Sequence, residues 1–375
     1  MPDLRAATGS DGLSYAGDLS DRTFEPLDGP TAEVIDLGRI SDALHAVTWE
    51  IEHAPTYSAC GVHIPFLFGL VTLIEPRVFV ELGVQAGASF FGACQAVQRQ
   101  GYGTRCVAVD EWPDDASPAG KLACGEFDDV RRIITDNYAG IAGYLRRDFA
   151  KARAHFAPGS IDLLHIAGSH TDAAARNDFT TWLDRMSDRG VVIVHDINEF
   201  KQDFGVWRFW REVCQQYPSM ELGHGHGLGV LVVGENSPLR LPVEGTDIVP
   251  MSPVVNSQLQ VFFGGLGHLS WSQAIGSAAR REREQILAEE MRALQALQRE
   301  HRVAREASDR LRVELAGQEA RIVQLREQRD RLRLKVGRMS EELDAAQARV
   351  IDLESSTSWR ITKPLRAIRR PGRRG

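Results

Sequence analysis

Short apolar runs alternate with amphipathic segments through the first two thirds of the chain. The apolar runs predict strands at 78–82, 105–109, 161–166, 190–194 and 229–233, with a further strand near Tyr144–Leu145. The segments between them have helical periodicity, at 41–53, 65–74, 89–100, 126–138, 173–186 and 207–216. Strands that are apolar on both faces and alternate with helices are typical of a parallel sheet covered on both sides. We therefore predict an α/β domain over 38–234, preceded by a loose arm at 1–37.

A second pattern follows the α/β pattern. Residues 235–280 are rich in Pro and Gly, which predicts a linker or a flap. From Leu287 onward, apolar residues recur at alternating spacings of three and four, and fifteen of the twenty seam positions down to Leu353 are apolar. A period of 3.5 predicts a left-handed coiled coil, here over 281–354, whereas a single solvated helix would not keep that register. We expect a parallel homodimer or homotrimer through 287–353. Four polar seam residues are expected to lower its stability while fixing its register and number of strands: His301, Ser308, Gln318 and Arg329.

The α/β part of the chain and the part with the heptad pattern differ in net charge. The whole chain has a net charge of −7, but the part from Arg281 onward holds 23 Lys and Arg against 16 Asp and Glu. The tail at 355–375 interleaves basic residues with Trp359, Ile361, Leu365 and Ile368. This combination predicts peripheral contact with an anionic membrane surface, although a solvated disordered tail is an equal alternative. The acidic globular part disfavours nucleic acid as a partner.

Cysteine spacing and the N-terminal composition indicate the compartment. The five cysteines are widely spaced and include no CxxC pair, which is typical of reduced thiols rather than disulfides or a zinc site. The N-terminus lacks the basic head and apolar run of a secretory signal. A cytoplasmic location is therefore expected, with the inner face of the membrane as a further contact.

The first candidate binding motif follows the strand at 78–82. It reads ELGVQAGAS, from Glu81 to Ser89, and it opens the next helix. Glycines there allow close approach of a ligand, and a helix N-terminus offers free N–H groups. The spacing between Gly83 and Gly87 is GxxxG rather than GxGxxG, which disfavours a dinucleotide pyrophosphate. A tight turn without a ligand is the structural alternative.

Asp110 ends the following strand, in the sequence VAVDEW. An acidic residue at the carboxyl end of the second strand is placed to accept hydrogen bonds from both hydroxyls of a ribose. Together with the glycine motif it predicts a nucleoside cofactor, while a helix-capping role for Asp110 is the alternative.

The run GSIDLLHIAGSH, continued by RGVVIVHDIN and HGHGLGVLVVG, makes residues 60–234 resemble class I S-adenosylmethionine-dependent methyltransferases of the Methyltransf_24 type. The resemblance implies a Rossmann-like sheet of seven strands, the last antiparallel. It also implies that Glu81, Gly83 and Gly87 line the methionine and ribose portion of S-adenosyl-L-methionine, and that Asp110 holds the ribose. The family usually has Asp where this chain has Ala167, so we expect no metal ligand set.

The candidate catalytic residues follow adjacent strands. Because imidazole is suited to proton abstraction near neutral pH, we expect His170 to act as general base and Asp196 to orient it or the acceptor hydroxyl. A metal site joining His170, His195 and Asp196 would be poor for Mg²⁺, which prefers several oxygen ligands. His195 is as well explained by packing at a strand end.

The aromatic segment FGVWRFWR at 204–211 is either core packing or a flap over the acceptor, and HGHG at 224–227 is expected to be a turn.

These patterns predict an S-adenosylmethionine-dependent O-methyltransferase with an appended coiled coil. The resemblance to bacterial surface-glycan systems implies a sugar hydroxyl of a glycan, or of its precursor, as acceptor. Such enzymes take part in polysaccharide biosynthesis, and SWRITKPLR in the tail resembles an element of envelope-glycan enzymes. One alternative is a non-catalytic coiled-coil scaffold with a degenerate methyltransferase fold, which Ala167 favours. A nicotinamide-dependent oxidoreductase is the other alternative, and the GxxxG spacing disfavours it.

Overall fold

The computed structural model describes residues 17–26, 37–55, 58–113, 118–201, 203–239 and 253–362. It divides into two units at Glu284, which are treated separately here. The first unit holds a seven-stranded sheet of order β3-β2-β1-β4-β5-β7-β6. Its strands are β1 (Val78–Leu82), β2 (Arg105–Asp110), β3 (Ala142–Arg146), β4 (Ile161–Ile166), β5 (Met186–His195), β6 (Ser219–Leu222) and β7 (Leu228–Val232).

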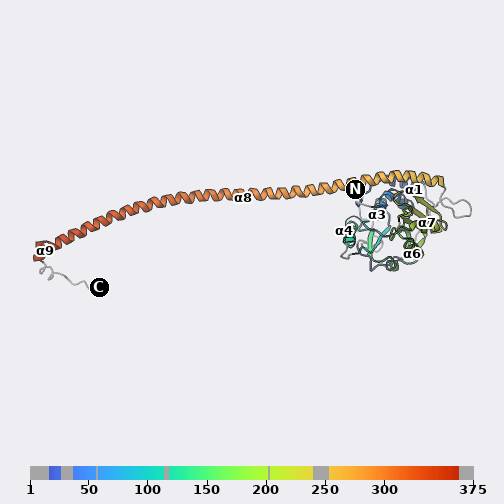
Figure 1. Cartoon of the computed structure of the whole chain (residues 1–375), viewed down its shortest axis with the longest axis horizontal. Helices are drawn as coiled ribbons and strands as arrows, with labels where there is room; N and C mark the ends of the chain where they lie inside the picture. The colour runs from blue at the N-terminus through green and yellow to red at the C-terminus, as the bar shows by residue number, and fades with distance from the viewer. Residues whose placement is uncertain are drawn as a thin grey trace. The chain divides into compact units, whose positions relative to one another are not determined.

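The strand directions confirm the predicted architecture. The first five strands pair in parallel, whereas β7 runs antiparallel to both β5 and β6. Helices cover both faces, as Figure 1 shows for the start of α8 and α1 on one side and α6 on the other. The helices of the unit are α1 (Leu37–Ala46), α2 (Ile64–Ile74), α3 (Ala88–Gln100), α4 (Pro118–Asn137), α5 (Phe149–Ala152), α6 (Asp172–Trp182), α7 (Val206–Val213) and the first part of α8 (Pro253–Ser355), with 3₁₀ turns at Cys60–His63, Arg153–His155 and Leu183–Arg185.

Two apolar cores, one on each face, hold the helices on the sheet. One core packs α2, α3 and α4 against the sheet, and the other packs α6 and α7. Burial of apolar surface at about 25 cal/mol per Å² is the main force that fixes these helices. The strand order reverses between β1 and β4, and open α/β sheets bind ligands at the carboxyl ends of the strands beside such a reversal.

The structure corrects the prediction of a loose arm at 1–37. Within the described part of the arm, Asp18 and Phe24 form β-bridges with Tyr144 and Phe156. The side chains of Leu19 and Phe24 are each 1% exposed. The arm is therefore packed over residues 17–26, because its two apolar side chains fill the core beneath β3 and the turn after α5.

The prediction of a linker at 235–280 is also wrong over its second half. From Pro253 the chain is helical and forms the start of α8. A Cβ on Gly267 would lie 1.9 Å from the carbonyl oxygen of Val62, so glycine there lets the helix lie against the domain. Trp271 is 8% exposed and packs over Gly61. Residues 240–252 lie outside the described part.

The second unit is described by itself. From Gln285, α8 continues to Ser355, and the short helix α9 (Thr357–Ile361) follows, capped by the hydroxyl of Ser356. The predicted helix over 281–354 is confirmed, and in the single chain its seam side chains are about half exposed, for example Leu294 at 50% and Leu325 at 49%. The basic residues from Lys363 onward lie outside the described part. No described helix combines the length and apolarity needed to cross a bilayer.

Candidate functional site

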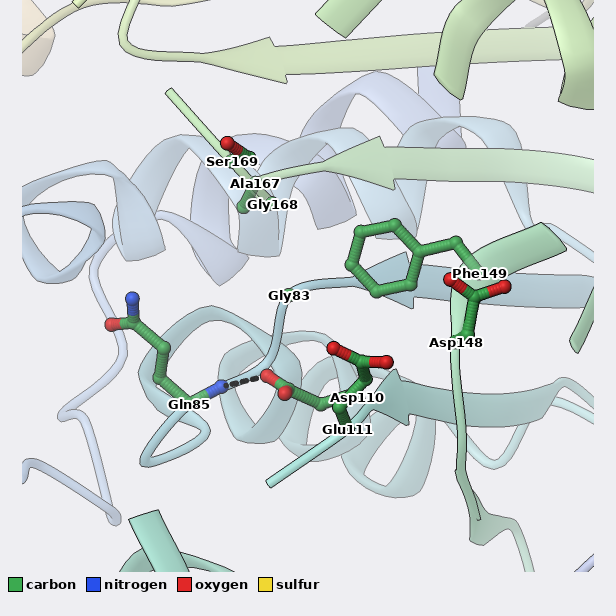
Figure 2. Close-up of a pocket in the computed structure, with 9 residues that line it drawn as sticks. All are labelled: Gly83, Gln85, Asp110, Glu111, Asp148, Phe149, Ala167, Gly168 and Ser169. Atoms are coloured by element: carbon green, nitrogen blue, oxygen red, sulfur yellow. Dashed lines mark hydrogen bonds between the residues drawn. The ribbon is translucent and has the colours of Figure 1, made fainter. Parts of the chain in front are cut away.

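A pocket opens at the carboxyl ends of the strands that flank the reversal of strand order. It has a volume of 250 Å³, and nine residues line it: Gly83, Gln85, Asp110, Glu111, Asp148, Phe149, Ala167, Gly168 and Ser169. Figure 2 shows that they come from the loops after β1, β2, β3 and β4 and converge on one space. Four separate parts of the sequence therefore build the pocket.

Gly83 fixes the shape of the pocket floor. Its φ of 86° lies in the left-handed region, and a Cβ there would be 2.4 Å from the carbonyl oxygen of Ala167. The loops after β1 and β4 can approach so closely only with glycine at this position. Gly83 thus lines the pocket, and its predicted contact with the cofactor stays a prediction.

Asp110 lies at the mouth of the pocket. Its two carboxylate oxygens accept hydrogen bonds from the backbone N–H groups of Gln85, at 2.9 Å, and Trp112, at 3.1 Å; Figure 2 shows the first of these bonds. The indole N–H of Trp112 donates in turn to the carbonyl of Gln85 at 2.8 Å. Each carboxylate oxygen has a second lone pair for a ligand hydroxyl. The helix-capping alternative is wrong, because the three residues that follow Asp110 are not helical.

Glu81 and Gly87 occupy positions behind the pocket. Glu81 is 1% exposed, accepts a hydrogen bond from the hydroxyl of Ser89 at 2.7 Å, and pairs with Nδ1 of His165 at 3.1 Å. Gly87 begins α3 with a φ of 84°, and a Cβ there would lie 2.4 Å from the ring of Phe91. Neither residue is among those that line the pocket, so both support the turn from β1 into α3.

The pocket carries negative charge. Three of its lining residues are Asp110, Glu111 and Asp148, and none of the described lining residues is basic. Carboxylates in a partly enclosed site attract cations and repel phosphates. The pocket therefore suits a cationic ligand with hydroxyl groups, and it disfavours the pyrophosphate of a dinucleotide.

His170 and Asp196 meet beside the pocket, as predicted. Nδ1 of His170 lies 2.6 Å from Oδ2 of Asp196, and the ring of Phe204 stacks on the imidazole with centroids 4.5 Å apart. The His170 side chain is 40% exposed and that of Asp196 is 4% exposed. An imidazole whose Nδ1 is held by a buried carboxylate leaves Nε2 free to accept a proton.

A small cavity around His170 and Asp196 shares a wall with the larger pocket. Ala167, Gly168 and Ser169 line both spaces. A ligand in the pocket and a molecule beside His170 would thus be separated only by this short loop.

Asp196 is surrounded by imidazoles. Oδ1 of Asp196 lies 3.1 Å from Nδ1 of His195 and 3.2 Å from Nδ1 of His226. Nε2 of His226 in turn lies 3.2 Å from Oε2 of Glu199. Burial by itself would raise the pKa of Asp196, but the hydrogen bonds to His170 and His195 hold that pKa well below its ordinary value. Asp196 is therefore an anion throughout the physiological range.

The orientation of His195 does not suit a metal site formed by His170, His195 and Asp196. Nε2 of His195 lies 3.1 Å from the carbonyl oxygen of Gly225, and Nδ1 faces Asp196, so both nitrogens already have partners. Among the described residues, no three His, Cys, Asp or Glu side chains are arranged to hold a metal ion. The packing interpretation of His195 at the end of β5 fits its 4% exposure.

The sequence analysis missed several residues of the site, among them Glu111, Asp148 and Phe149 in the pocket, Phe204 as the ring on His170, and His226. The HGHG segment was expected to be only a turn. In the structure the backbone N–H groups of Asp196 and Asn198 donate to the carbonyls of Gly227 and His226, at 3.0 and 2.8 Å. This places His226 against Asp196, which has a strained φ of 64°.

Known proteins match part of the chain. Residues 80–197 match the Methyltransf_24 family model, which describes a methyltransferase domain. The uncharacterized protein y4gI of Sinorhizobium fredii is 38% identical over 181 residues, which cover 48% of this chain and 20% of that protein. The chain thus matches about a fifth of the length of this curated relative.

Two solved structures illustrate what the fold of the chain is similar to. The O-methyltransferase of Bacillus cereus in complex with SAH is 16% identical, with a TM-score of 0.35, over 52% of this chain and 91% of that chain. Cofactor-bound Rv0187 from MTB is 16% identical, with a TM-score of 0.37, over 54% of this chain and 92% of that one. The strand order and the antiparallel β7 give the first unit the Rossmann-like fold of class I methyltransferases.

The lowered pKa of Asp196 predicts a specific acid sensitivity. A carboxylate whose pKa is lowered in the folded state stabilises the fold above its ordinary pKa of 3.8, and that stabilisation is lost as the pH falls toward the folded pKa. Between pH 6 and pH 3, the free energy of unfolding should therefore fall less in Asp196→Asn than in the unmodified chain, by about 1 kcal/mol. Urea unfolding at several pH values measures this. Asp136→Asn, an exposed aspartate on α4, is the control, and parallel curves for all three proteins would contradict the prediction.

Proposed function

We propose that the chain is an S-adenosylmethionine-dependent O-methyltransferase. The observation that carries the proposal is the acidic pocket at the switch point, joined through the loop 167–169 to a histidine–aspartate pair. The match of residues 80–197 to a methyltransferase family model supports it independently. When bound, S-adenosylmethionine supplies a methyl group activated by a positively charged sulfur.

The residues of the pocket suit this molecule in charge and in hydrogen bonding. Asp110 would accept hydrogen bonds from the ribose hydroxyls with its free lone pairs. The carboxylates of Asp110, Glu111 and Asp148 lower the energy of a ligand that carries an ammonium and a sulfonium. The same charges disfavour the nicotinamide alternative, because its cofactor brings a pyrophosphate to this position.

His170 would act as the general base on the acceptor. Asp196 holds Nδ1, so that Nε2 takes the hydroxyl proton while the hydroxyl oxygen bonds to the methyl carbon. Bound S-adenosylmethionine would supply the methyl group and keep the electron pair of the carbon–sulfur bond on its sulfur, and the imidazolium of His170 would be stabilised by the anionic Asp196. The buried position of Asp196 strengthens this interaction, because little water screens it.

The acceptor that we propose is a sugar hydroxyl of a surface glycan or of its precursor. This part of the proposal rests on the resemblance to glycan-modifying methyltransferases. A non-catalytic scaffold is the second candidate, and Ala167 is the observation that favours it, since this position often carries Asp in the family. A cytoplasmic location belongs to the same proposal.

Replacement of Asp110 tests the cofactor site. Asp110→Ala removes the acceptor of two ligand hydrogen bonds, each of which contributes roughly 1.5–3 kcal/mol when the acceptor is charged. Calorimetry should show S-adenosylmethionine affinity weakened by at least tenfold. Asp128→Ala on α4, an exposed aspartate outside the pocket, is the control. Unchanged affinity in a folded Asp110→Ala protein would remove Asp110 from the site, and no binding by the unmodified chain would favour the scaffold.

Replacement of His170 tests the chemistry. His170→Ala should lower the rate of methyl transfer by about 10²–10⁴, because the general base is lost, while S-adenosylmethionine affinity stays unchanged. The activity of the unmodified chain should survive EDTA, since Ala167 replaces the residue that metal-using relatives supply. Loss of activity with EDTA, and its return with Mg²⁺, would instead favour a metal mechanism.

We further propose that residues 287–353 assemble the chain into a homo-oligomer. At ~1.5 Å per residue the seam is about 100 Å long. Its apolar side chains are about half exposed in the single chain, and a second copy in register would bury them.

Light scattering at micromolar concentration should give at least twice the chain mass. Leu325→Lys with Leu332→Lys, both on the seam, should lower that mass, whereas Arg326→Lys with Arg333→Lys should not; a monomer mass for the unmodified chain would contradict the proposal.

The tail, finally, is proposed to contact the inner face of the cytoplasmic membrane. Each basic residue near an anionic surface contributes about 1 kcal/mol, and two or more tails on one oligomer would add their attachments. Liposomes containing anionic lipid should therefore pellet the full chain in a salt-sensitive manner. A chain that ends at Glu354 and neutral liposomes are the controls. Equal pelleting of both chains would rule out the tail as the attachment.

A further inference from the structure

A patch of aromatic and cationic side chains lies on the outer face of α7 and the residues before it. It consists of Phe200, Phe204, Trp207, Arg208 and Arg211, and is called here the α7 patch. The rings of Phe200 and Trp207 have centroids 5.6 Å apart, and Phe200 is 60% exposed. The guanidinium carbons of Arg208 and Arg211 lie 4.5 and 5.1 Å from the centroid of the same Trp207 ring. Two cations therefore share one indole.

Neither guanidinium of the patch is neutralised. Within the described ranges of the chain, Arg208 and Arg211 have no carboxylate partner, whereas the neighbouring Arg176 and Lys201 pair with Glu212 and Glu199. Two like charges held near each other repel, and an anion between them would relieve that repulsion. Guanidinium groups bind phosphate and carboxylate through directed hydrogen bonds, and stacking on an aromatic ring holds them ready to do so.

The patch is continuous with the catalytic pair. The backbone N–H of Gly205 donates to the carbonyl of His170 at 2.7 Å, and Phe204 stacks on the His170 ring. The inner face of α7, formed by Val206, Phe209, Trp210 and Val213, is buried, and the indole N–H of Trp210 donates to Glu221 at 2.9 Å. The helix is thus fixed by its inner face, and Arg208 and Arg211 lie on its exposed side.

The charge of the patch is opposite to that of the cofactor pocket. The pocket presents three carboxylates, and the patch presents two unpaired guanidiniums together with the exposed ring of Phe200 and the half-buried ring of Trp207. An anionic group on the acceptor would be repelled from the pocket and attracted to the patch. This separation would orient the acceptor with its anionic end away from the methyl donor.

We propose that the α7 patch is the acceptor subsite and that the acceptor is an anionic sugar. Its phosphate or carboxylate lies on Arg208 and Arg211, and the apolar face of its ring packs on Phe200 and Trp207. A hydroxyl of the same sugar then reaches His170. This inference rests on the proposed methyltransferase function and narrows its substrate to sugars that carry a negative charge.

Binding of small sugars to the full chain, saturated with S-adenosylhomocysteine, tests the proposal without turnover. The probes are glucose 1-phosphate, glucuronate, inorganic phosphate and neutral glucose, and calorimetry or ligand-observed NMR measures their affinities. The unmodified chain should bind at least one anionic sugar tenfold more tightly than glucose, and more tightly than inorganic phosphate. A preference between glucose 1-phosphate and glucuronate then tells a phosphorylated sugar from a uronic acid.

The matched variants change net charge equally. Arg208→Gln with Arg211→Gln should reduce the preference for the anionic sugar by tenfold or more. Arg131→Gln with Arg132→Gln, on α4, removes two arginines that pair with Asp128 and Asp129, and it should leave the preference unchanged. Equal loss in both variants, or no preference for anions in the unmodified chain, would overturn the inference. S-adenosylhomocysteine affinity, measured in the same samples, separates this outcome from a failure of the proposed function, which would show as no binding of that molecule.

Discussion

The buried carboxylate of Asp196 is the interaction on which the site depends. The Asp196 side chain is 4% exposed, directly follows β5, and faces the imidazoles of His170, His195 and His226. An unpaired charge at this depth would cost several kcal/mol, so the three imidazoles and the loops that carry them have to be held in place together. The backbone bonds from Asp196 and Asn198 to the 226–227 loop do this, even though Asp196 and His226 adopt strained positive φ values. The contacts of this one carboxylate thus hold the loops after β4, β5 and β6 together.

The second constraint is the division of charge across the loop 167–169. Carboxylates line the pocket on one side of it, and the histidine–aspartate pair lies on the other, beside the cationic α7 patch. Gly83 makes this division possible, because any side chain there would collide with the loop. A cationic methyl donor and an anionic acceptor would each find a complementary surface, with the transferred group between them.

Much of this could be predicted from the sequence, and the failures have physical causes. The parallel strands β1, β2, β4 and β5 were predicted because buried parallel strands are continuous apolar runs, and the antiparallel β7 was predicted because it too is a buried apolar run. The strand β6 was missed because it is a four-residue edge strand with an exposed Glu221. The start of α8 was missed because Pro253 and three nearby glycines look irregular, although proline suits a first helical turn and Gly267 is needed for contact with Val62. His226 was missed because only the antiparallel pairing of β5 with β7, which sets His195 opposite Leu228, brings its loop to Asp196.

The most direct measurement is a crystal structure of the chain grown with S-adenosylhomocysteine. The account predicts the ribose hydroxyls on the carboxylate of Asp110 and the amino-acid portion in the pocket lined by Gly83 and Ala167. The sulfur should face the loop 167–169, toward His170 and Asp196. Density for the ligand elsewhere, or a sulfur directed away from His170, would contradict the assignment of this pocket and of its base.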